Sequence, residues 1–210
     1  FIDFVDIPFT KGWVQIKGEL AYGKFMDNDF LRDHYNYYNQ YITTDALCHH
    51  KSISFRSNPD KPFVVTIGAE LAAQFGGTKR YYEKGILIDS LTMKSPTRLK
   101  DFFKILFPSS GDGQTNEGDQ AYYYGNHVGQ WNLSAEYRFK DNSSVRGYFE
   151  WYFDDASGMG KFNGWDGLWG LEYKSGKKNW LANVVLEYLD MTNQSGPLNW
   201  CPSDYNDPKL

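Results

Sequence analysis

Acidic and amide side chains stand beside a tryptophan in one short polar loop of this sequence. Asp154, Asp155, Asn163 and Asp166 carry groups that hydrogen-bond sugar hydroxyls, and the ring of Trp165 can stack on a pyranose face. This combination predicts a carbohydrate contact. The same residues also suit a glycine-rich loop that Asp and Asn hold through hydrogen bonds to its own backbone, and this alternative stays open.

Four further candidates for a sugar contact lie near other strand ends. His127 and Trp131 stand where a long polar region enters a strand, and a tryptophan there also suits the girdle at a membrane interface. Asn193 and Trp200 belong to a second polar loop, for which simple turn formation is the alternative. We therefore predict polysaccharide binding by all of these residues together.

The sequence supports catalysis less well than it supports sugar binding. Glu150 with Asp154 or Asp155 could supply the acid and the nucleophile of a glycosidase. Acidic residues are common on strands, however, and the sequence marks none of them as having a raised pKa. We expect no enzymatic activity.

A metal site is also not expected. Cys48, His49 and His50 are adjacent, so on a strand they point to alternate faces, and no second ligand pair has zinc-like spacing. The two cysteines, Cys48 and Cys201, suit either one disulfide or two thiols. We predict no metal and no cofactor.

Two hairpins with strict alternation must position the candidate residues. Apolar and polar side chains alternate over residues 131–139 and 145–153, and again over 167–173 and 180–188. A period of two indicates strands, because successive side chains point to opposite faces. The apolar face has no charge and tends to end in aromatic rings, as in strands that cross a bilayer. A soluble β-sandwich with this face turned inward is the alternative.

The rest of the chain adds strands and one helix. We predict strands over 13–25, 47–56 and 64–75, with a weaker one over 1–9 and a short one over 86–91. A loop over 26–46 separates the first two of the clear strands. The strand over 64–75 is expected to end at Gly76 and Gly77. Residues 95–106 predict a short amphipathic helix with Leu99, Phe102, Phe103 and Leu106 on one face.

The connections between these strands alternate between short and long along the whole chain. Up-and-down membrane barrels have tight turns at one end and long loops at the other, whereas a Greek-key sandwich has no reason to keep this alternation. We therefore predict an all-β fold, an antiparallel up-and-down transmembrane β-barrel with a short helix in a long loop. We expect residues 1–210 to form a single barrel domain that is incomplete at both ends.

Composition narrows the class of protein further. The 210 residues are 18% aromatic and carry a formal net charge of −4, without a stripe of basic residues. This balance argues against nucleic acid as a partner. The longest apolar run is far shorter than the roughly 20 residues of a transmembrane helix, a test that does not bear on strands.

Several multi-residue runs together resemble the capsule assembly Wzi family. These runs are, in order, His49-His50-Lys51 with Arg56, Gly68-Ala69-Glu70, Ala72-Ala73-Gln74-Phe75-Gly76-Gly77, Gly125-Asn126-His127 with Gly129 and Trp131, Asp154-Asp155 with Ser157-Gly158, Asn163-Gly164 with Asp166-Gly167-Leu168-Trp169-Gly170, and Asn193-Gln194-Ser195-Gly196-Pro197. They cover most of the chain between Trp13 and Pro197.

The resemblance implies an outer-membrane β-barrel of a Gram-negative bacterium that acts as a lectin and holds capsular polysaccharide on the cell surface, without enzymatic activity. Family barrels have more strands than this chain supplies, in keeping with an incomplete barrel. The expected partners are capsular polysaccharide and outer-membrane lipid, and we expect a monomer. A general porin or diffusion channel and a soluble carbohydrate-active β-protein are the rival hypotheses.

Overall fold

The computed structural model describes residues 2–26, 29–38, 40–115, 120, 123–154, 164–177 and 180–193. In this part of the chain ten strands form one sheet, and eight of them follow one another in chain order, β1-β2-β3-β4-β7-β8-β9-β10. The strand pairs with a described register are antiparallel. The predicted all-β fold with antiparallel, up-and-down order is confirmed.

The strands are β1 (Ile2–Asp6), β2 (Val14–Lys24), β3 (Gln40–Ser57), β4 (Phe63–Glu83), β5 (Ile86–Leu87), β6 (Met93–Lys94), β7 (Asn126–Arg138), β8 (Ser144–Asp154), β9 (Gly167–Lys174) and β10 (Asn183–Asp190). The helices are α1 (Phe30–Tyr35) and α2 (Leu99–Leu106), with 3-10 turns at Pro8–Thr10 and Asp89–Leu91. Short connections alternate with long ones along the eight-strand path, as the sequence predicts.

Two compact units divide this sheet along its strands. The first comprises Phe1–Leu20, Lys51–Leu71 and Val128–Asn199, and the second comprises Ala21–His50, Ala72–His127 and Trp200–Leu210. Each unit has its own pattern of burial and is described by itself.

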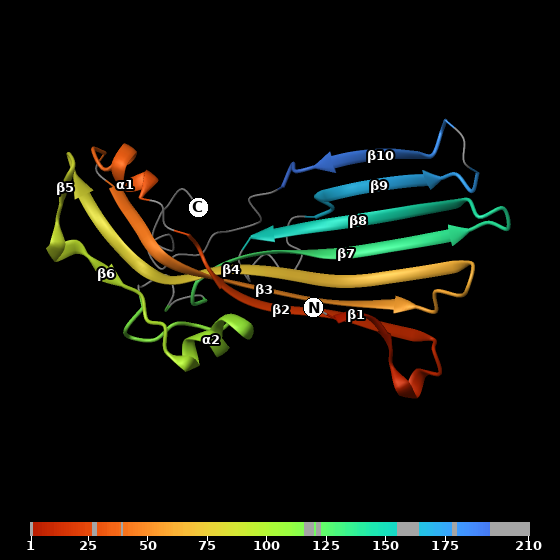
Figure 1. Cartoon of the computed structure of the whole chain (residues 1–210), viewed down its shortest axis with the longest axis horizontal. Helices are drawn as coiled ribbons and strands as arrows, with labels where there is room; N and C mark the ends of the chain where they lie inside the picture. The colour runs from red at the N-terminus through yellow and green to blue at the C-terminus, as the bar shows by residue number, and fades with distance from the viewer. Residues whose placement is uncertain are drawn as a thin grey trace. The chain divides into compact units, whose positions relative to one another are not determined.

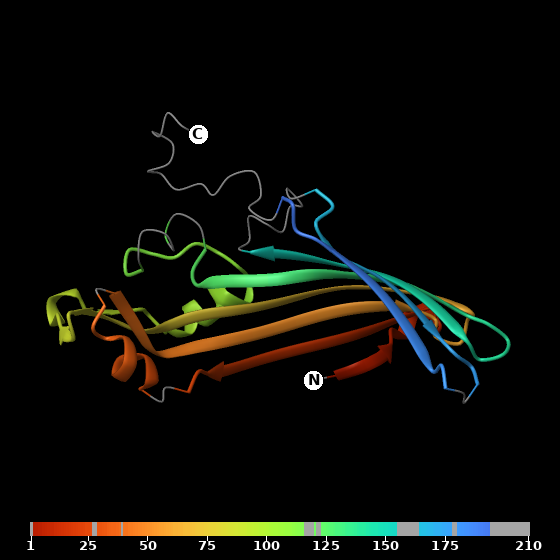
Figure 2. The ribbon, with the colours of Figure 1, turned by 90° about the horizontal axis from the view of Figure 1, so that it is seen from above.

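In the first unit, β7, β8, β9 and β10 lie side by side in chain order (Figure 1), and Figure 2 shows the same four strands from above. Their register pairs apolar with apolar side chains. Leu133 lies opposite Phe149, and Leu171 lies opposite Leu186. The predicted facing of both hairpins is confirmed by this register.

The apolar face of these four strands is exposed on β7, β9 and β10. Eight of its side chains there are between about two fifths and two thirds exposed, and Leu133 is 48% exposed. These are Leu133, Tyr137, Trp169, Leu171, Tyr173, Val184, Leu186 and Tyr188. On β8, by contrast, Phe149 is partly buried and Phe153 is 5% exposed.

The opposite face of the same strands is polar and internally paired. Arg146 on β8 forms an ion pair with Glu172 on β9 at 2.8 Å, and the Tyr148 hydroxyl donates a hydrogen bond to Glu187 on β10. The Tyr148 ring crosses directly over Gly170, where any side chain would collide with it. The charged side chains of Arg146, Glu172 and Glu187 therefore lie on one side of the sheet, whereas Tyr137, Tyr173 and Tyr188 lie on the other.

Gly167 begins β9 in a conformation that other residues rarely adopt. Its φ is 146°, and a Cβ atom there would come within 2.4 Å of the Glu150 carbonyl oxygen. A glycine lets β9 start in close contact with β8.

In the second unit, the chain covers its own apolar strand surface. Phe75 and Ala73 of β4 pack against Ile105 of α2 and against Tyr124, and Leu47 and Phe102 lie at the margin of this cluster. Tyr22 of β2 adds its ring to Phe102 at a centroid distance of 5.3 Å. This small cluster is the principal core of the unit.

Two ion-paired carboxylates attach α2 to the segment that follows it. Asp101 is fully buried and accepts hydrogen bonds from the backbone and guanidinium of Arg98. The same guanidinium reaches Asp112 at 2.9 Å, and Lys100 reaches Asp112 at 2.7 Å. These contacts fix the start of the helix.

The predicted helix is confirmed, but its buried side is not centred on the apolar face of Leu99, Phe102, Phe103 and Leu106. Leu99 is 76% exposed and Phe103 is also exposed, whereas Ile105 is completely buried. Apolar spacing identifies the residues that share a face of the helix, but not which of them pack against the strands. The helix is only two turns long, so a small rotation about its axis decides which of its neighbouring apolar residues meets β4.

Strand limits also differ from the prediction, with β7 beginning at Asn126 rather than at Trp131 and β10 at Asn183 rather than at Trp180. Residues 26–46 are not all loop, because β3 begins at Gln40 and α1 precedes it. β4 continues past Gly76 and Gly77 to Glu83, although both glycines have positive φ. The strand predicted over 86–91 shrinks to β5, followed by a 3-10 turn.

The glycine pair explains the error in β4. A Cβ on Gly77 would come within 2.8 Å of the Thr44 carbonyl oxygen, so the glycines permit a close approach of β3 within a continuing strand. Paired glycines are usually a stop signal, but here they mark a local irregularity.

Candidate functional site

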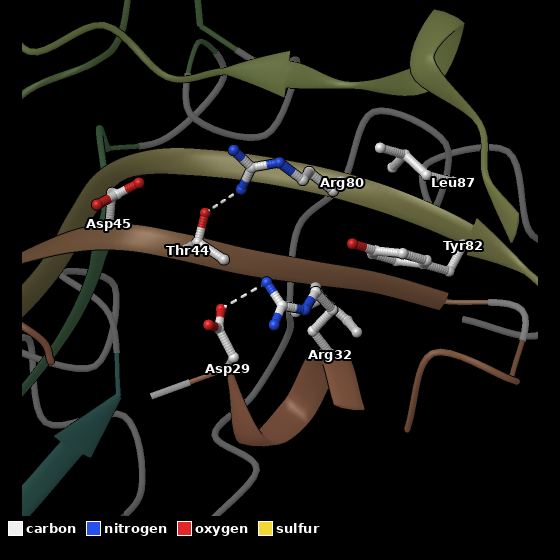
Figure 3. Close-up of a pocket in the computed structure, with 8 residues that line it drawn as sticks. Asp29, Arg32, Thr44, Asp45, Arg80, Tyr82 and Leu87 are labelled. Atoms are coloured by element: carbon white, nitrogen blue, oxygen red, sulfur yellow. Dashed lines mark hydrogen bonds and ion pairs between the residues drawn. The ribbon is translucent and has the colours of Figure 1, made fainter. Parts of the chain in front are cut away.

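A polar cavity of about 270 Å³ opens among the elements of the second unit (Figure 3). Its size is close to the lower limit of about 300 Å³ for pockets that hold drug-sized ligands. It is lined by Asp29, Arg32, Ile42, Thr44, Asp45, Arg80, Tyr82 and Leu87. The strands β3 and β4 supply five of these residues, and α1 with its preceding residue supplies two.

Strand alternation places the key side chains of the cavity. Arg80 and Tyr82 are two positions apart on β4 and share a face, as Ile42 and Thr44 do on β3. Asp45 follows Thr44 with a φ of 58°, which breaks the regular alternation and brings a second polar group to the lining.

The two carboxylates of the cavity are each held by a cation. Asp29 lies 2.9 Å from Arg32, an interaction drawn in Figure 3, and Asp45 lies 2.5 Å from Lys24. Arg32 also contacts Asp33 at 3.0 Å. These pairs are about half exposed, so they orient side chains more than they stabilise the fold.

Arg80 differs from the other cations. Its guanidinium donates a hydrogen bond to the Thr44 hydroxyl, and it makes no ion pair with any residue of the described chain. In Figure 3 the hydroxyl of Tyr82 points toward the same region. The cavity thus combines charged and hydroxyl donors with the apolar side chains of Ile42 and Leu87, an arrangement that suits a sugar ring with polar substituents.

One residue from each of the two polar loops predicted from the sequence contacts the other. The Asp166 carboxylate accepts hydrogen bonds from the Asn193 backbone at 2.6 Å and from the Asn193 side-chain amide at 3.2 Å. Asp166 is 1% exposed. Its hydrogen bonds to Asn193 join two loops. They neither support nor contradict a sugar contact there.

Trp165 stands at the margin of an aromatic cluster. It is 65% exposed, and its ring centroid lies 5.9 Å from Trp169 and 6.4 Å from Phe149. Trp169 in turn lies on the exposed apolar face. Rings so placed suit both a sugar platform and a membrane interface.

The other predicted site residues are scattered. His127 is buried, with its ring beside the Tyr124 carbonyl oxygen at 3.0 Å. Trp131 pairs with Trp151 across the hairpin, and Asp154 is exposed at the end of β8. Asp155, Asn163 and Trp200 lie outside the described residues.

The geometry of β8 weighs against a glycosidase pair at Glu150 and Asp154. They lie four positions apart on one extended strand, which separates their Cα atoms by about 13 Å. The carboxylates of glycosidases lie about 5–9.5 Å apart. Glu150 is moreover engaged by the Tyr152 hydroxyl at 2.9 Å.

Within the described ranges, no group of three or more potential ligands is arranged to hold a metal ion. Cys48 is a free thiol there, and Cys201 lies outside those ranges. The sequence patterns do not single out the cavity residues Arg32, Thr44, Arg80 and Tyr82. They predict a loop over residues 26–46 and a strand end before residue 78, so the strand alternation that brings these side chains together is not apparent from them.

Comparison with known proteins adds no relative. No family model, no curated protein and no solved structure matches this chain. Among the described residues, no helix has the length and apolar character needed to cross a bilayer.

Proposed function

We propose that this chain is a segment of an outer-membrane β-barrel protein that binds and anchors capsular polysaccharide at the surface of a Gram-negative bacterium. The exposed apolar face of β7, β9 and β10 is the observation that carries this proposal. It joins the resemblance of the sequence to the capsule assembly Wzi family, which remains an interpretation of motifs.

An uncharged face of this kind needs a cover. Leu133, Leu171 and Leu186 share it with aromatic residues, and large contiguous apolar surfaces mark sites of membrane or protein contact. A β-sandwich would cover the face with a second sheet. The described strands form one sheet, so lipid is the cover we propose.

The lengths of the central strands fit the same proposal. β4 has 21 residues and β3 has 18, whereas a crossing takes about 9–11 residues. The surplus includes Thr44, Arg80 and Tyr82 of the cavity. In the proposed protein these extensions display the cavity beyond the membrane, where polysaccharide is present.

Binding without covalent chemistry is the proposed activity. Hydrogen bonds to sugar hydroxyls replace bonds to water, so each contact contributes little net free energy. A polymer with many repeats offsets this weakness through multivalency. The proposed protein therefore retains a long chain through several weak contacts made by many copies.

Fractionation of the full-length protein in a Gram-negative host tests the proposal. We expect recovery in the outer membrane, heat-modifiable migration on a gel, and retention of capsular polysaccharide by the purified protein. Recovery in the soluble periplasm would overturn the membrane assignment. Outer-membrane recovery without polysaccharide retention would overturn the anchoring role.

A diffusion channel is the second candidate, favoured by the polar face that carries Arg146, Glu172 and Glu187. In a closed barrel this face would line the interior. Planar-bilayer recordings of the purified protein distinguish the two. Large steady conductance without polysaccharide binding favours the channel, and polysaccharide binding without conductance favours the anchor.

A further inference from the structure

Arg80 has fewer ion pairs with the rest of the described chain than the other cations near the cavity. It is partly buried, and its fork of N–H donors has one described hydrogen bond, to the Thr44 hydroxyl. By contrast Arg32 and Lys24 are each paired with a carboxylate at 3.0 Å or less. A partly desolvated guanidinium with several unused donors is a ready site for an anion.

A second donor joins Arg80 from the same strand. Tyr82 is buried, its hydroxyl points into the cavity in Figure 3, and that hydroxyl makes no hydrogen bond with the rest of the described chain. The Thr44 hydroxyl accepts from Arg80 and keeps its own proton to donate. Three donor groups thus face one cavity without an acceptor that satisfies them all.

The acidic residues nearby do not fill this role. Asp29 is bound to Arg32, and Asp45 is bound to Lys24 at 2.5 Å. Each carboxylate thus has its own ion pair, and a hydrogen bond from Lys24, together with the charges of Lys24 and Arg80, lowers the pKa of Asp45. An incoming anion meets in Arg80 a cation that has no ion pair of its own in the described chain. The apolar side chains of Ile42 and Leu87 leave room beside it for the carbon skeleton of a ligand.

We propose that the cavity binds the carboxylate of an acidic sugar unit, with Arg80 as the charged donor and the Tyr82 and Thr44 hydroxyls as its partners. This inference rests on the proposed function and narrows its ligand to polysaccharides with uronic acid units. A carboxylate presents two acceptor oxygens that match the fork of a guanidinium, which a neutral hydroxyl does not. The cavity of about 270 Å³ accommodates a ligand smaller than a drug-sized molecule, such as a single sugar unit.

Saturation-transfer NMR on the detergent-solubilised full-length protein tests this assignment. The probes are D-glucuronate, its neutral methyl ester, and glucose 6-phosphate. We expect glucuronate to bind about tenfold more tightly than the ester, because hydrogen bonds to a charged group are the stronger ones. Equal binding of acid and ester would overturn the proposal. Tighter binding of the phosphate would show an anion site that is not built for a carboxylate.

Matched variants test whether Arg80 and Tyr82 cause the preference for glucuronate over its methyl ester. Arg80→Gln should remove the preference for acid over ester, and Arg32→Gln, which breaks a pair with Asp29, should retain it. Tyr82→Phe keeps the ring and should weaken glucuronate binding about threefold to tenfold, so the test survives if Arg80→Gln does not fold. An unchanged preference in both Arg80→Gln and Tyr82→Phe would overturn the assignment.

The two proposals fail separately. A protein that stays in the outer membrane and retains polysaccharide, but shows no preference for the acid, would overturn only the carboxylate site. A protein absent from the outer membrane would overturn the anchoring role whatever its sugar preference.

Discussion

Two regions of this protein are built from the same alternating strands and treat their apolar faces in opposite ways. Along β7, β9 and β10 most of the large apolar side chains are exposed, with Leu133 about half exposed. Along the later part of β4, Phe75 is buried by Ile105 and Tyr124, which come from the long connection that follows the strand. One face is covered by the protein itself, and the other is not.

The difference shows how much of its apolar burial each region obtains from the chain itself. Burial of apolar area is the main favourable contribution to folding, at about 25 cal/mol per Å². The core around Ile105 obtains this contribution within its own unit. The exposed apolar side chains of the hairpins obtain little of it within the described chain, and in the proposed membrane protein lipid would supply the rest.

The largest expected effect comes from a charge on the exposed apolar face. Leu133→Arg should prevent assembly into the outer membrane, since an arginine on a lipid-facing position costs about 2–4 kcal/mol near the bilayer centre. Ser134→Arg, one position along and on the polar face, should be tolerated. Heat-modifiable migration of the membrane fraction measures both.

Equal damage from the two arginines would contradict the facing assignment. Equal tolerance would be as informative, because it would mean that water meets both faces of β7. In that case a soluble protein with a partner sheet would replace the membrane protein.

The space left by removing a buried side chain from the core around Ile105 should destabilise only that region. Ile105→Ala removes a fully buried side chain and should cost about 2–5 kcal/mol. Leu99→Ala on the same helix removes an exposed side chain and should cost less than about 0.5 kcal/mol. Proteolysis within residues 84–125 should accelerate only in Ile105→Ala, while its heat-modifiable migration stays normal. Loss of that migration would show that the two regions depend on one another.

Much of the fold could be predicted from the sequence, because alternation is a local property. Each strand from Val14 onward in which polar and apolar residues alternate appears in the sheet, and the register of β7 with β8 follows from the same pattern. The error at Gly76 and Gly77 has a different origin. Whether a glycine pair ends a strand depends on the neighbouring strand that approaches it, which no local pattern contains.

The cavity could not be predicted for a similar reason. Arg32 and Arg80 are far apart in the sequence, and only strand pairing and the position of α1 bring them to one lining. The predicted polar loop was recognisable because its residues are close in sequence. Asp166 of that loop meets Asn193 of the second polar loop through hydrogen bonds that the sequence could not assign.

Acid should loosen the region around α2. Burial alone would raise the pKa of Asp101, but hydrogen bonds from the side chain and backbone of Arg98 outweigh it, so the pKa lies below its usual value. Hydrogen bonds from Lys100 and then Arg98 likewise lower the pKa of Asp112. A lowered pKa stabilises the fold above the unfolded value of about 4, and this stabilisation is lost as pH falls through the folded value.

Hydrogen exchange of the α2 amides at pH 6 and pH 3 measures this dependence. We expect faster opening at pH 3 than the intrinsic exchange rates explain. Asp101→Asn should destabilise the region by about 1–3 kcal/mol at pH 6 and reduce the difference between the two pH values. The same acid response in wild type and Asp101→Asn would assign the effect to other groups.

The smallest effect is expected on the polar face of the hairpins. Arg146 and Glu172 lie 2.8 Å apart, but the Arg146 side chain is 44% exposed, and pairs so exposed contribute about 0–1 kcal/mol. Glu172→Gln should therefore leave heat-modifiable migration unchanged and shift the urea midpoint only slightly. Because the Asn183 amide also donates to Glu172, at 3.0 Å, a glutamine oxygen can keep that contact. A large loss of stability would mean that this face is dry, and the polar interior expected of a barrel would then be excluded.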